Sequence, residues 1–420
     1  SEMCIRDREY PRRCGLPFRC RVCLNSMQPH TAELLAARRE LQDIRTEQNK
    51  AGKEIARLEG DAKRQAVEKM AELKSRAKKL SERIGELEPQ LDELMLLVPQ
   101  PAAAEVPVGA DDTENVEIRR EGKVPKFDFA PKDHVQLGEA LDIIDIPRGV
   151  KLAGSRNFVL KGAGAMLHQA VLRLALDMMI ERGYLPLTVP VLVNESVMYG
   201  TGWFPVGRDQ AYLVERDSQS LVGTAEVPVT ALHADETLTE TDLPKKYVAL
   251  STCFRREAGA AGKDTYGLYR IHYFDKVEQV VICRNDEQAS LEFHQEILAN
   301  AEAVLKALEL PYRVVNVCTG DLGQGQVQKF DIETWMPSRG AYGETHSASR
   351  FHDFQARRLR MRYRGADGKV RFCHTLNNTV IASPRILIPL LELNQNADGS
   401  VTIPVALRAY MNGMEKIQPR

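Results

Sequence analysis

Three features that would assign this chain to an obvious class are missing from its 420 residues. No apolar run reaches the roughly 20 residues that a membrane-spanning helix needs, so we expect no membrane partner. The formal net charge is −1, so no overall field favours nucleic acid, and any such binding needs a local basic surface. The eight cysteines show no disulfide framework, which favours a reducing, cytoplasmic location.

The first 29 residues also lack a clear pattern. They have no sustained periodicity and no apolar segment of a signal peptide. Cys20 and Cys23 form half of a zinc-type motif, with no second half at a plausible spacing, so metal binding here is disfavoured. We expect residues 1–29 to be an atypical N-terminus, and a non-native origin is one interpretation of it.

Residues 30–98, in contrast, carry a strong heptad pattern. A heptad repeat that is apolar except at Gln48 runs through Leu34, Leu41, Gln48 and Ile55 and, after a phase slip near Gly60, through Leu73, Leu80, Leu87 and Leu94. Two heptad helices separated by a phase break predict an antiparallel coiled-coil hairpin, with helices of about 30 residues and about 45 Å. Taken alone, the pattern is also typical of a dimerisation or spacer coiled coil.

The rest of the chain divides into a linker and a large body. Residues 99–122 are rich in proline and alanine and then acidic, which predicts a linker. Because single cores rarely grow beyond about 250–300 residues, we expect the body, residues 123–420, to be a separate domain. Its patterns predict helices at 163–182 and 284–310 and strands at 312–317 and 329–335, and therefore an α+β fold.

The most informative stretch of the body runs from Cys253 to Glu278. An apolar segment, residues 247–254, is followed by a loop rich in glycine and alanine. A second apolar segment, residues 268–274, continues to Cys283. This composition predicts two antiparallel strands joined by a long loop, and hairpin loops of this length are more often functional than idle.

The charges on this hairpin suit a nucleotide. Guanidinium groups such as that of Arg255 bind phosphate and carboxylate oxygens through paired hydrogen bonds. Because Arg270 and Phe274 are four residues apart on a predicted strand, we expect them on one sheet face, which Glu278 continues. A cation and an aromatic ring on one face predict a site for a triphosphate and a stacked base. For each residue taken singly, an ordinary hairpin with solvated arginines is the alternative.

The pattern F-R-x-E followed by R-x-H-x-F-x-x-x-E resembles motif 2 of the class II aminoacyl-tRNA synthetases, and residues 258–278 resemble the bacterial seryl-tRNA synthetases in particular. The resemblance spans residues 31–417. It implies an α+β fold in which an N-terminal antiparallel coiled-coil hairpin precedes a class II catalytic domain, an antiparallel sheet flanked by helices. It also implies a homodimer, with the motif 1 segment at residues 163–190 in its interface.

The activity implied by the resemblance is that of a serine–tRNA ligase. With ATP and Mg²⁺, such an enzyme activates L-serine to seryl-adenylate and transfers it to tRNA(Ser), which the coiled-coil arm grips, and we expect tRNA(Sec) to be charged as well. No protein nucleophile is needed, so catalysis is positioning and charge stabilisation.

Matching positions in the motifs imply roles for individual residues. Arg255, Arg270 and Arg385 carry catalysis, and Glu344 and Ser347 hold the metal. The residues implied to bind ATP form a larger set: Arg255, Arg256, Glu257, Arg270, Phe274, Glu344, Thr345, His346, Ser347 and Arg385. The residues implied to bind serine are Thr224, Ala225, Glu226, Arg255, Glu278, Asn377 and Thr379. On this basis we expect Glu278→Ala to lose serine activation while the chain still folds.

Some of these matches have ordinary explanations or depart from the family pattern. Thr224 and Glu226 equally suit a helix cap with an acidic first turn. The residues after Glu344 differ from the family's polar run, and Pro384 stands where glycine is common. Residues 354–358 match a strand of the family.

Two other functions compete with the synthetase interpretation. The first is a homologue that loads a carrier protein, which is disfavoured because such proteins lack the long arm. The second is a coiled-coil scaffold without catalysis, which is disfavoured because Arg255, Arg270 and Arg385 are all present. Amino-acid-dependent exchange between ATP and pyrophosphate distinguishes an adenylating enzyme from such a scaffold.

Overall fold

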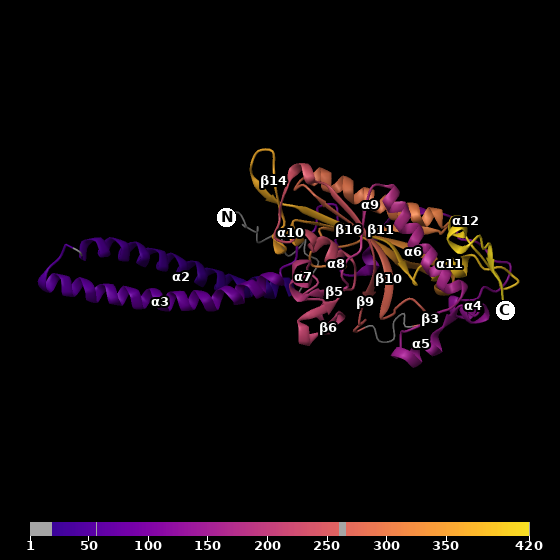
Figure 1. Cartoon of the computed structure of the whole chain (residues 1–420), viewed down its shortest axis with the longest axis horizontal. Coiled ribbons are helices and arrows are strands. Elements are labelled where there is room, and N and C mark those ends of the chain that lie inside the picture. Colours follow the sequence, from indigo (N-terminus) through magenta and orange to yellow (C-terminus); the bar gives the residue numbers. More distant parts are fainter. Residues whose placement is uncertain (1–18, 56, 260–265, 420) are drawn as a thin grey trace. The chain divides into compact units, whose positions relative to one another are not determined.

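The computed structural model describes residues 19–55, 57–259 and 266–419, with side chains from residue 27 onward. The chain divides into two compact units, residues 1–99 and 100–420. Figure 1 shows the first as a pair of long helices and the second as a sheet covered by helices. We call the first unit the arm and the second the body.

The arm is a helical hairpin. α2 (Arg19–Ile55) and α3 (Gly60–Leu96) have 37 residues each and pack along one another (Figure 1). Their seam buries the heptad positions Leu34, Ala37, Leu41, Ile44 and Leu87. The predicted hairpin is therefore confirmed, but at 1.5 Å per residue each helix is about 55 Å long, not about 45 Å.

The arm begins earlier than the heptad pattern indicated. α2 starts at Arg19, so residues 19–29 continue the helix instead of preceding it, while residues 1–18 lie outside the described residues. Ion pairs across the hairpin, such as Arg83 with Glu33 at 2.7 Å, are solvent-exposed. Solvent-exposed ion pairs contribute little to stability, so the apolar seam supplies most of it.

An eight-stranded sheet forms the centre of the body, in the order β1-β11-β12-β13-β16-β10-β9-β4. Its strands are β1 (Val116–Glu121), β11 (Tyr312–Asn316), β12 (Gln328–Met336), β13 (Ala341–His352), β16 (His374–Ser383), β10 (Tyr273–Cys283), β9 (Lys245–Phe254) and β4 (Leu185–Leu187). All neighbours are antiparallel except β4, which pairs with β9 in parallel. Residues 116–121, predicted as part of a linker, are thus the edge strand β1.

Two long helices, α6 (Ala163–Glu181) and α9 (Glu287–Ala307), cover one face of this sheet (Figure 1) and contact each other and β16. The Asp286 side chain caps α9 by accepting a 2.7 Å hydrogen bond from the Ala289 N–H. Within the described residues, α6 is the one helix long and apolar enough to cross a membrane, and 50% of its apolar window is buried inside the body.

Smaller elements surround the sheet. The helices are α4 (His134–Ala140), α5 (Ile146–Ala153), α7 (Glu195–Gly200), α8 (Glu226–Thr230), α10 (Phe354–Arg358), α11 (Leu387–Leu393) and α12 (Val405–Arg408). The minor sheets contain β2 (Ile144–Asp145) with β3 (Val159–Leu160), β5 (Leu192–Asn194) with β7 (Gln219–Leu221) and β6 (Tyr212–Val214), β8 (Thr237–Thr239) with β14 (Arg362–Arg364) and β15 (Val370–Phe372), and β17 (Val401–Thr402) with β18 (Lys416–Ile417).

Two predicted strands are wrong in part or in whole. β10 begins at Tyr273, because residues 266–272 fold as turns that bury Leu268 and Ile271, three residues apart. Arg270 therefore does not share a strand face with Phe274. Residues 354–358 form the helix α10, in which the Arg357 N–H donates to the Asp353 carbonyl at 2.8 Å.

Candidate functional site

Two β-bulges shape the sheet face opposite α6 and α9. The pairing of β12 with β13 shifts at Thr345, so that Glu344 and Thr345 both reach this face. The pairing of β10 with β16 shifts at Val380, which brings Ala382 to the face that Thr379 already occupies. An extra residue re-aims the side chains that follow it, and bulges are frequent beside active sites for this reason.

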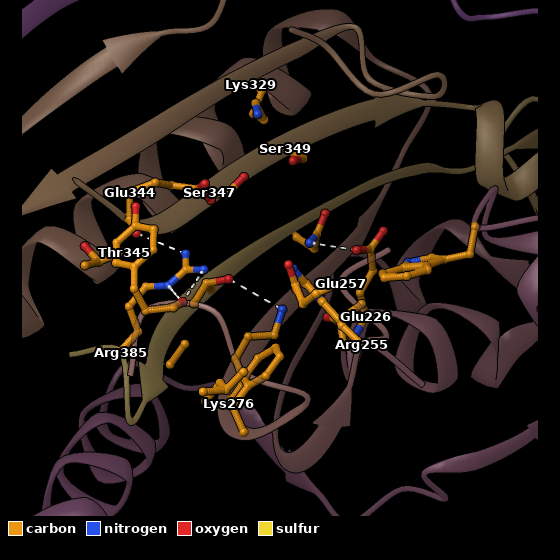
Figure 2. A pocket seen from close by; sticks show the side chains of 18 of the residues that line it. Glu226, Arg255, Glu257, Lys276, Lys329, Glu344, Thr345, Ser347, Ser349 and Arg385 are labelled. Atoms are coloured by element: carbon orange, nitrogen blue, oxygen red, sulfur yellow. Dashed lines mark hydrogen bonds between the residues drawn. The ribbon is translucent and has the colours of Figure 1, made fainter. Parts of the chain in front are cut away.

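The resulting pocket gathers residues that are far apart in the chain (Figure 2). It is lined by Trp203, Thr224, Glu226, Arg255, Glu257, Tyr269, Ile271, Phe274, Lys276, Gln326, Lys329, Glu344, Thr345, Ser347, Ser349, Asn377, Thr379, Ala382 and Arg385. Figure 2 shows Glu344, Ser347 and Arg385 at one end and Glu226 with Arg255 at the other.

Five residues at or just beneath the pocket surface form what we call the deep cluster: Glu226, Lys276, Glu278, Asn377 and Thr379. All are at least nine-tenths buried. Lys276 forms an ion pair with Glu278. The Asn377 amide donates to Glu278 at 2.7 Å and to Glu226 at 3.1 Å, so one side chain holds both carboxylates in place. The Thr379 hydroxyl lies 3.4 Å from Glu278.

Glu226 is poised between its two protonation states. Burial, together with the nearby Glu278 carboxylate, raises the pKa of Glu226 to about 7. The Glu226 oxygen that does not contact Asn377 accepts a 2.8 Å hydrogen bond from the Gln355 side chain. The Thr224 hydroxyl accepts the Glu226 backbone N–H at 3.1 Å just before α8, but the N-cap residue of α8 is Ala225 and no side chain caps the helix, so the expected cap at Thr224 is absent.

The deep cluster has an unused acceptor. The Asn377 Oδ1 atom is buried without a hydrogen-bond partner among the described residues. An orphaned buried acceptor costs about 1–3 kcal/mol, which a ligand offering an N–H or O–H group offsets. The cluster therefore suits a small ligand with an ammonium or hydroxyl group.

The outer cluster, which we define as Arg255, Glu257, Arg270, Glu344 and Arg385, stays partly accessible to solvent. Arg255 stacks over Phe274 at 5.3 Å and Trp203 at 5.8 Å and donates to the Gly223 carbonyl at 3.3 Å. Its charge acts on Glu226 and on Glu344, so it influences both clusters.

The other arginines of the outer cluster are held mainly by backbone or by one carboxylate. Arg270 donates to Glu257 at 3.1 Å. Arg385 precedes α11 and donates to the carbonyls of Tyr269 at 3.2 and 3.3 Å and of Glu344 at 3.1 Å. The carbonyl contacts do not themselves neutralise the guanidinium charge of Arg385, which also acts on the Glu344 carboxylate and suits an anionic ligand.

Glu344 and Ser347 fit a magnesium ion shared with phosphates. The crowded pocket disfavours the charge of Glu344, but the cations of Arg385 and Lys329 lower the pKa of its carboxyl below the usual value. Mg²⁺ prefers such oxygen ligands and usually takes only one or two from the protein. No group of three or more metal-binding side chains occurs in the described part of the chain.

Most of the predicted site residues meet at this pocket, but five do not line it. Arg270 and Glu278 lie next to lining residues, since Arg270 donates to Glu257 and Glu278 forms an ion pair with Lys276. Ala225 and His346 are buried, and burial lowers the pKa of His346 to about 4. The Arg256 side chain is exposed outside the pocket.

The structure adds lining residues that the sequence did not indicate. Lys276 had a signal, since it lies between Phe274 and Glu278 with the alternation of a strand. No pattern in the sequence indicated Lys329 of β12 or Ser349 of β13, because these strands reach the pocket only through sheet pairing. Gln326, which precedes β12, was not indicated either.

Residues 212–394 match the family model described as the tRNA synthetase class II core domain (G, H, P, S and T). The body is therefore the core of a class II aminoacyl-tRNA synthetase. A Giardia lamblia prolyl-tRNA synthetase structure, 14% identical with a TM-score of 0.57, shares the fold over 65% of this chain and 54% of its own.

Comparison over the whole length identifies the family within this class. The chain is 45% identical to the serine–tRNA ligase of Deinococcus radiodurans over 93% of this chain and 92% of that protein. The structure of seryl-tRNA synthetase from Pyrococcus horikoshii, complexed with ATP, matches with a TM-score of 0.93 and 38% identity, covering 99% of this chain and 98% of that one. The cytoplasmic enzyme of Naegleria fowleri, complexed with AMP, matches with a TM-score of 0.86 and 29% identity over 98% and 95% of the two chains. The chain belongs to the seryl-tRNA synthetases, which are aminoacyl-tRNA ligases.

Proposed function

We propose that the two clusters divide the substrates of the serine–tRNA ligase reaction between them, with serine at the deep cluster and ATP at the outer cluster. The observation that carries this proposal is the Asn377 amide, which holds Glu226 and Glu278 while its own oxygen lacks a partner. The deep cluster offers two carboxylates and an acceptor to a ligand with one ammonium and one hydroxyl group.

The ammonium and hydroxyl groups of serine are bound at different parts of the deep cluster. Glu226 and Thr224 bind the ammonium group, and Glu278 with Thr379 and Asn377 recognises the hydroxyl group. A site built to hydrogen-bond a hydroxyl rejects an analogue without it by about 10⁴-fold, because its buried polar groups are left unpaired. Alanine is thereby excluded, and the buried walls of the pocket exclude the extra methyl group of threonine.

ATP lies against the outer cluster. Arg255 binds the α-phosphate and the serine carboxylate, Phe274 stacks on adenine, and Glu257 orients it. Arg385, together with Arg270, holds the β- and γ-phosphates. Glu344 and Ser347 would hold Mg²⁺, which would neutralise phosphate charge when bound. These side chains orient the serine carboxylate toward the α-phosphate and stabilise the charge that develops there.

Transfer to tRNA(Ser) involves the arm. Arg76 forms an ion pair with Glu40 across the hairpin. We therefore assign the contacts with tRNA phosphates to other exposed basic side chains, such as those of Arg39 and Lys79. Each true phosphate contact that is removed reduces the salt slope of tRNA affinity by about one. Arg39→Gln and Lys79→Gln are expected to do so without changing serine-dependent exchange, whereas Arg76→Gln leaves the slope unchanged.

We further infer a cytoplasmic homodimer that also charges tRNA(Sec). The segment from α6 to β4 resembles motif 1, and Leu185 of β4 is 57% exposed, which supports an interface there. Analytical ultracentrifugation of Leu185→Asp tests the dimer, and aminoacylation of both tRNAs tests the acceptor range.

Amino-acid-dependent ATP–pyrophosphate exchange tests the central proposal, with serine, threonine, alanine, glycine and proline in parallel. Exchange with serine alone is expected. Exchange with another amino acid contradicts the assignment of the deep cluster, and absence of exchange in folded protein contradicts the assignment of both clusters.

A further inference from the structure

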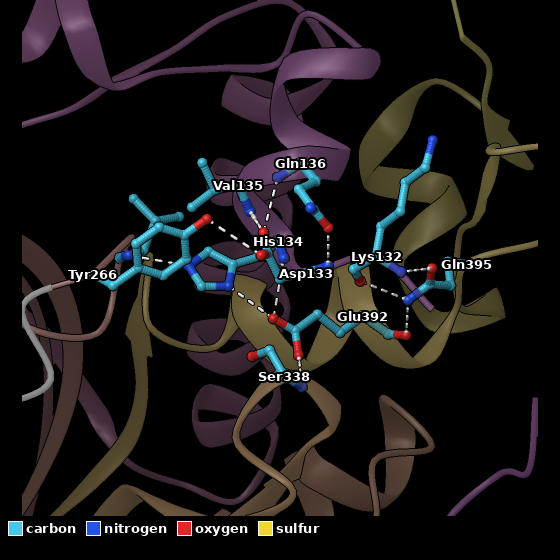
Figure 3. Close-up of polar contacts among 10 residues, drawn as sticks. Lys132, Asp133, His134, Val135, Gln136, Tyr266, Ser338, Glu392 and Gln395 are labelled. Carbon is cyan, nitrogen blue, oxygen red and sulfur yellow. Dashed lines mark hydrogen bonds and ion pairs between the residues drawn. The ribbon is translucent and has the colours of Figure 1, made fainter. Parts of the chain in front are cut away.

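A buried carboxylate outside the pocket joins three distant segments of the body (Figure 3). Glu392, near the end of α11, has no solvent exposure. Its Oε1 atom accepts the backbone N–H of His134 at 3.0 Å and lies 2.7 Å from the ring Nδ1 atom of the same residue. Its Oε2 atom accepts the backbone N–H of Ser338 at 2.9 Å. Glu392 therefore ties α11 to the start of α4 and to the segment before β13.

The His134 ring extends this connection to Leu268, in the segment that precedes β10. The Leu268 backbone N–H donates to the ring Nε2 atom at 3.2 Å. Because a backbone N–H can only donate, Nε2 carries the lone pair and Nδ1 carries the proton, which it donates to Glu392. The ring thus couples the position of Glu392 to the backbone at Leu268.

Gly267 shows independently that the backbone here is fitted to the ring. A Cβ atom at position 267 would overlap the His134 Nε2 atom. The φ angle of Gly267 is +65°, a conformation that other residues rarely adopt. Both constraints favour glycine at this position, so the close approach of ring and backbone is built into the chain.

From Leu268 the connection reaches the outer cluster in one residue. The Tyr269 carbonyl accepts two hydrogen bonds from Arg385, and the centre of the Tyr269 ring lies 4.6 Å from the Arg385 guanidinium and 4.3 Å from that of Arg339. Arg339 directly follows Ser338, which Glu392 also holds. Both branches of the network therefore converge on Tyr269, which contacts Arg385 through both its carbonyl and its ring.

We propose that His134 and Glu392 are positioning residues for serine activation, which hold the Leu268–Tyr269 backbone and thereby aim Arg385 at the triphosphate. Neither residue lines the pocket. The inference rests on the role proposed above for Arg385. A displacement of about 1 Å at a substrate-binding group can cost about 100-fold in rate, so a remote network of this kind has a measurable effect.

Two substitutions of His134 separate its two hydrogen bonds. His134→Asn places an amide N–H near the Nδ1 position and keeps the bond to Glu392, but has no group to accept from Leu268. His134→Gln places an amide oxygen near the Nε2 position and keeps the bond to Leu268. We expect His134→Asn to lower kcat/KM for ATP in serine-dependent exchange by about 30- to 100-fold, with KM for serine nearly unchanged, and His134→Gln to stay within about fivefold of the wild type.

Tyr266→Phe is the matched control. It removes the neighbouring 3.2 Å hydrogen bond from Tyr266 to Asp133 but leaves the hydrogen bond between Leu268 and His134 in place. It is expected to keep wild-type exchange. Each His134 variant loses one buried hydrogen bond, so similar decreases in Tm are expected. Equal losses of activity in the Asn and Gln variants would indicate a purely structural role and overturn the inference.

Arg385→Ala distinguishes this inference from the proposed function. An unchanged KM for ATP in Arg385→Ala overturns the role of Arg385 itself. A raised KM in Arg385→Ala, with no difference between the two His134 variants, overturns only the positioning role of His134 and Glu392.

Discussion

The two clusters of the pocket share one sheet face but are organised in opposite ways. In the deep cluster, Glu226 and Glu278 are buried and their oxygens are held by side chains, with Asn377 between them. In the outer cluster, Arg255 and Arg385 stay partly exposed and lean on backbone carbonyls at 3.1–3.3 Å.

This difference matches the ligands that we assign to each cluster. A small, neutral zwitterion such as serine offers little binding energy, so its partners must be held in place beforehand, and burial strengthens each contact. A triphosphate carries several charges and suits cations such as Arg255 and Arg385, whose side-chain hydrogen bonds go to backbone carbonyls. The comparison predicts that substitutions in the two clusters affect different substrates.

The largest effect is expected from Arg255, because it influences both clusters. Arg255→Ala should lower kcat/KM in ATP–pyrophosphate exchange by on the order of 10³-fold, since one preorganised donor at the reacting phosphate contributes this much. Arg255→Lys should restore little, because an ammonium cannot make the paired contacts of a guanidinium. An effect confined to KM for one substrate would show that Arg255 belongs to a single cluster.

Glu278 should give the next largest effect, on serine alone. Glu278→Gln removes an acceptor for the serine hydroxyl and should raise KM for serine by about 100-fold while KM for ATP stays nearly constant. Steady-state exchange with each substrate varied in turn measures this. A matching rise in KM for ATP would contradict the division between clusters.

Glu278→Ala is a poorer test than the sequence suggested. It leaves the buried Lys276 without its ion-pair partner, and breaking a buried pair costs about 3–5 kcal/mol of unfolding free energy. We therefore expect reduced stability in urea denaturation, and not normal folding. Lys276→Met combined with Glu278→Leu should recover stability but not serine activation.

A smaller effect is expected from pH, again only at the deep cluster. Glu226 has its pKa raised to about 7, so it is protonated below that pH and cannot pair with the serine ammonium. KM for serine should be about tenfold higher at pH 6 than at pH 8. By the same linkage, the ligand-free protein should lose stability as pH rises from 4.5 toward 7. Glu226→Gln should abolish both trends, and a flat profile in the wild type would contradict the assignment.

The smallest effect is expected from Arg256, although it lies next to Arg255. Its side chain is exposed outside the pocket, and such substitutions usually change free energies by about 0.5 kcal/mol or less. Arg256→Ala should therefore keep kcat/KM for ATP within about twofold. A loss comparable to that of Arg255→Ala would restore the role in ATP binding that the motif suggested.

Local patterns in the sequence were sufficient for the arm and for much of the pocket. The heptads identified the hairpin because a repeat of seven places residues such as Leu34 and Leu41 on one helix face, whatever surrounds them. Arg255, Phe274 and Arg385 were located by short motifs at the ends of β9, β10 and β16. The predicted strand at residues 268–272 failed because Leu268 bonds to His134, which is more than 100 residues away.

What the sequence determined by itself is therefore the arm, the α+β class of the body and several of the charged residues that line the pocket. What only the tertiary structure decided is how these residues meet. The bulges at Thr345 and Val380, the Asn377 bridge and the link from Glu392 through His134 all depend on contacts between distant segments. Hydrophobic period and motif are local properties of a chain, whereas sheet register and buried hydrogen bonding are decided only when the whole sheet has assembled.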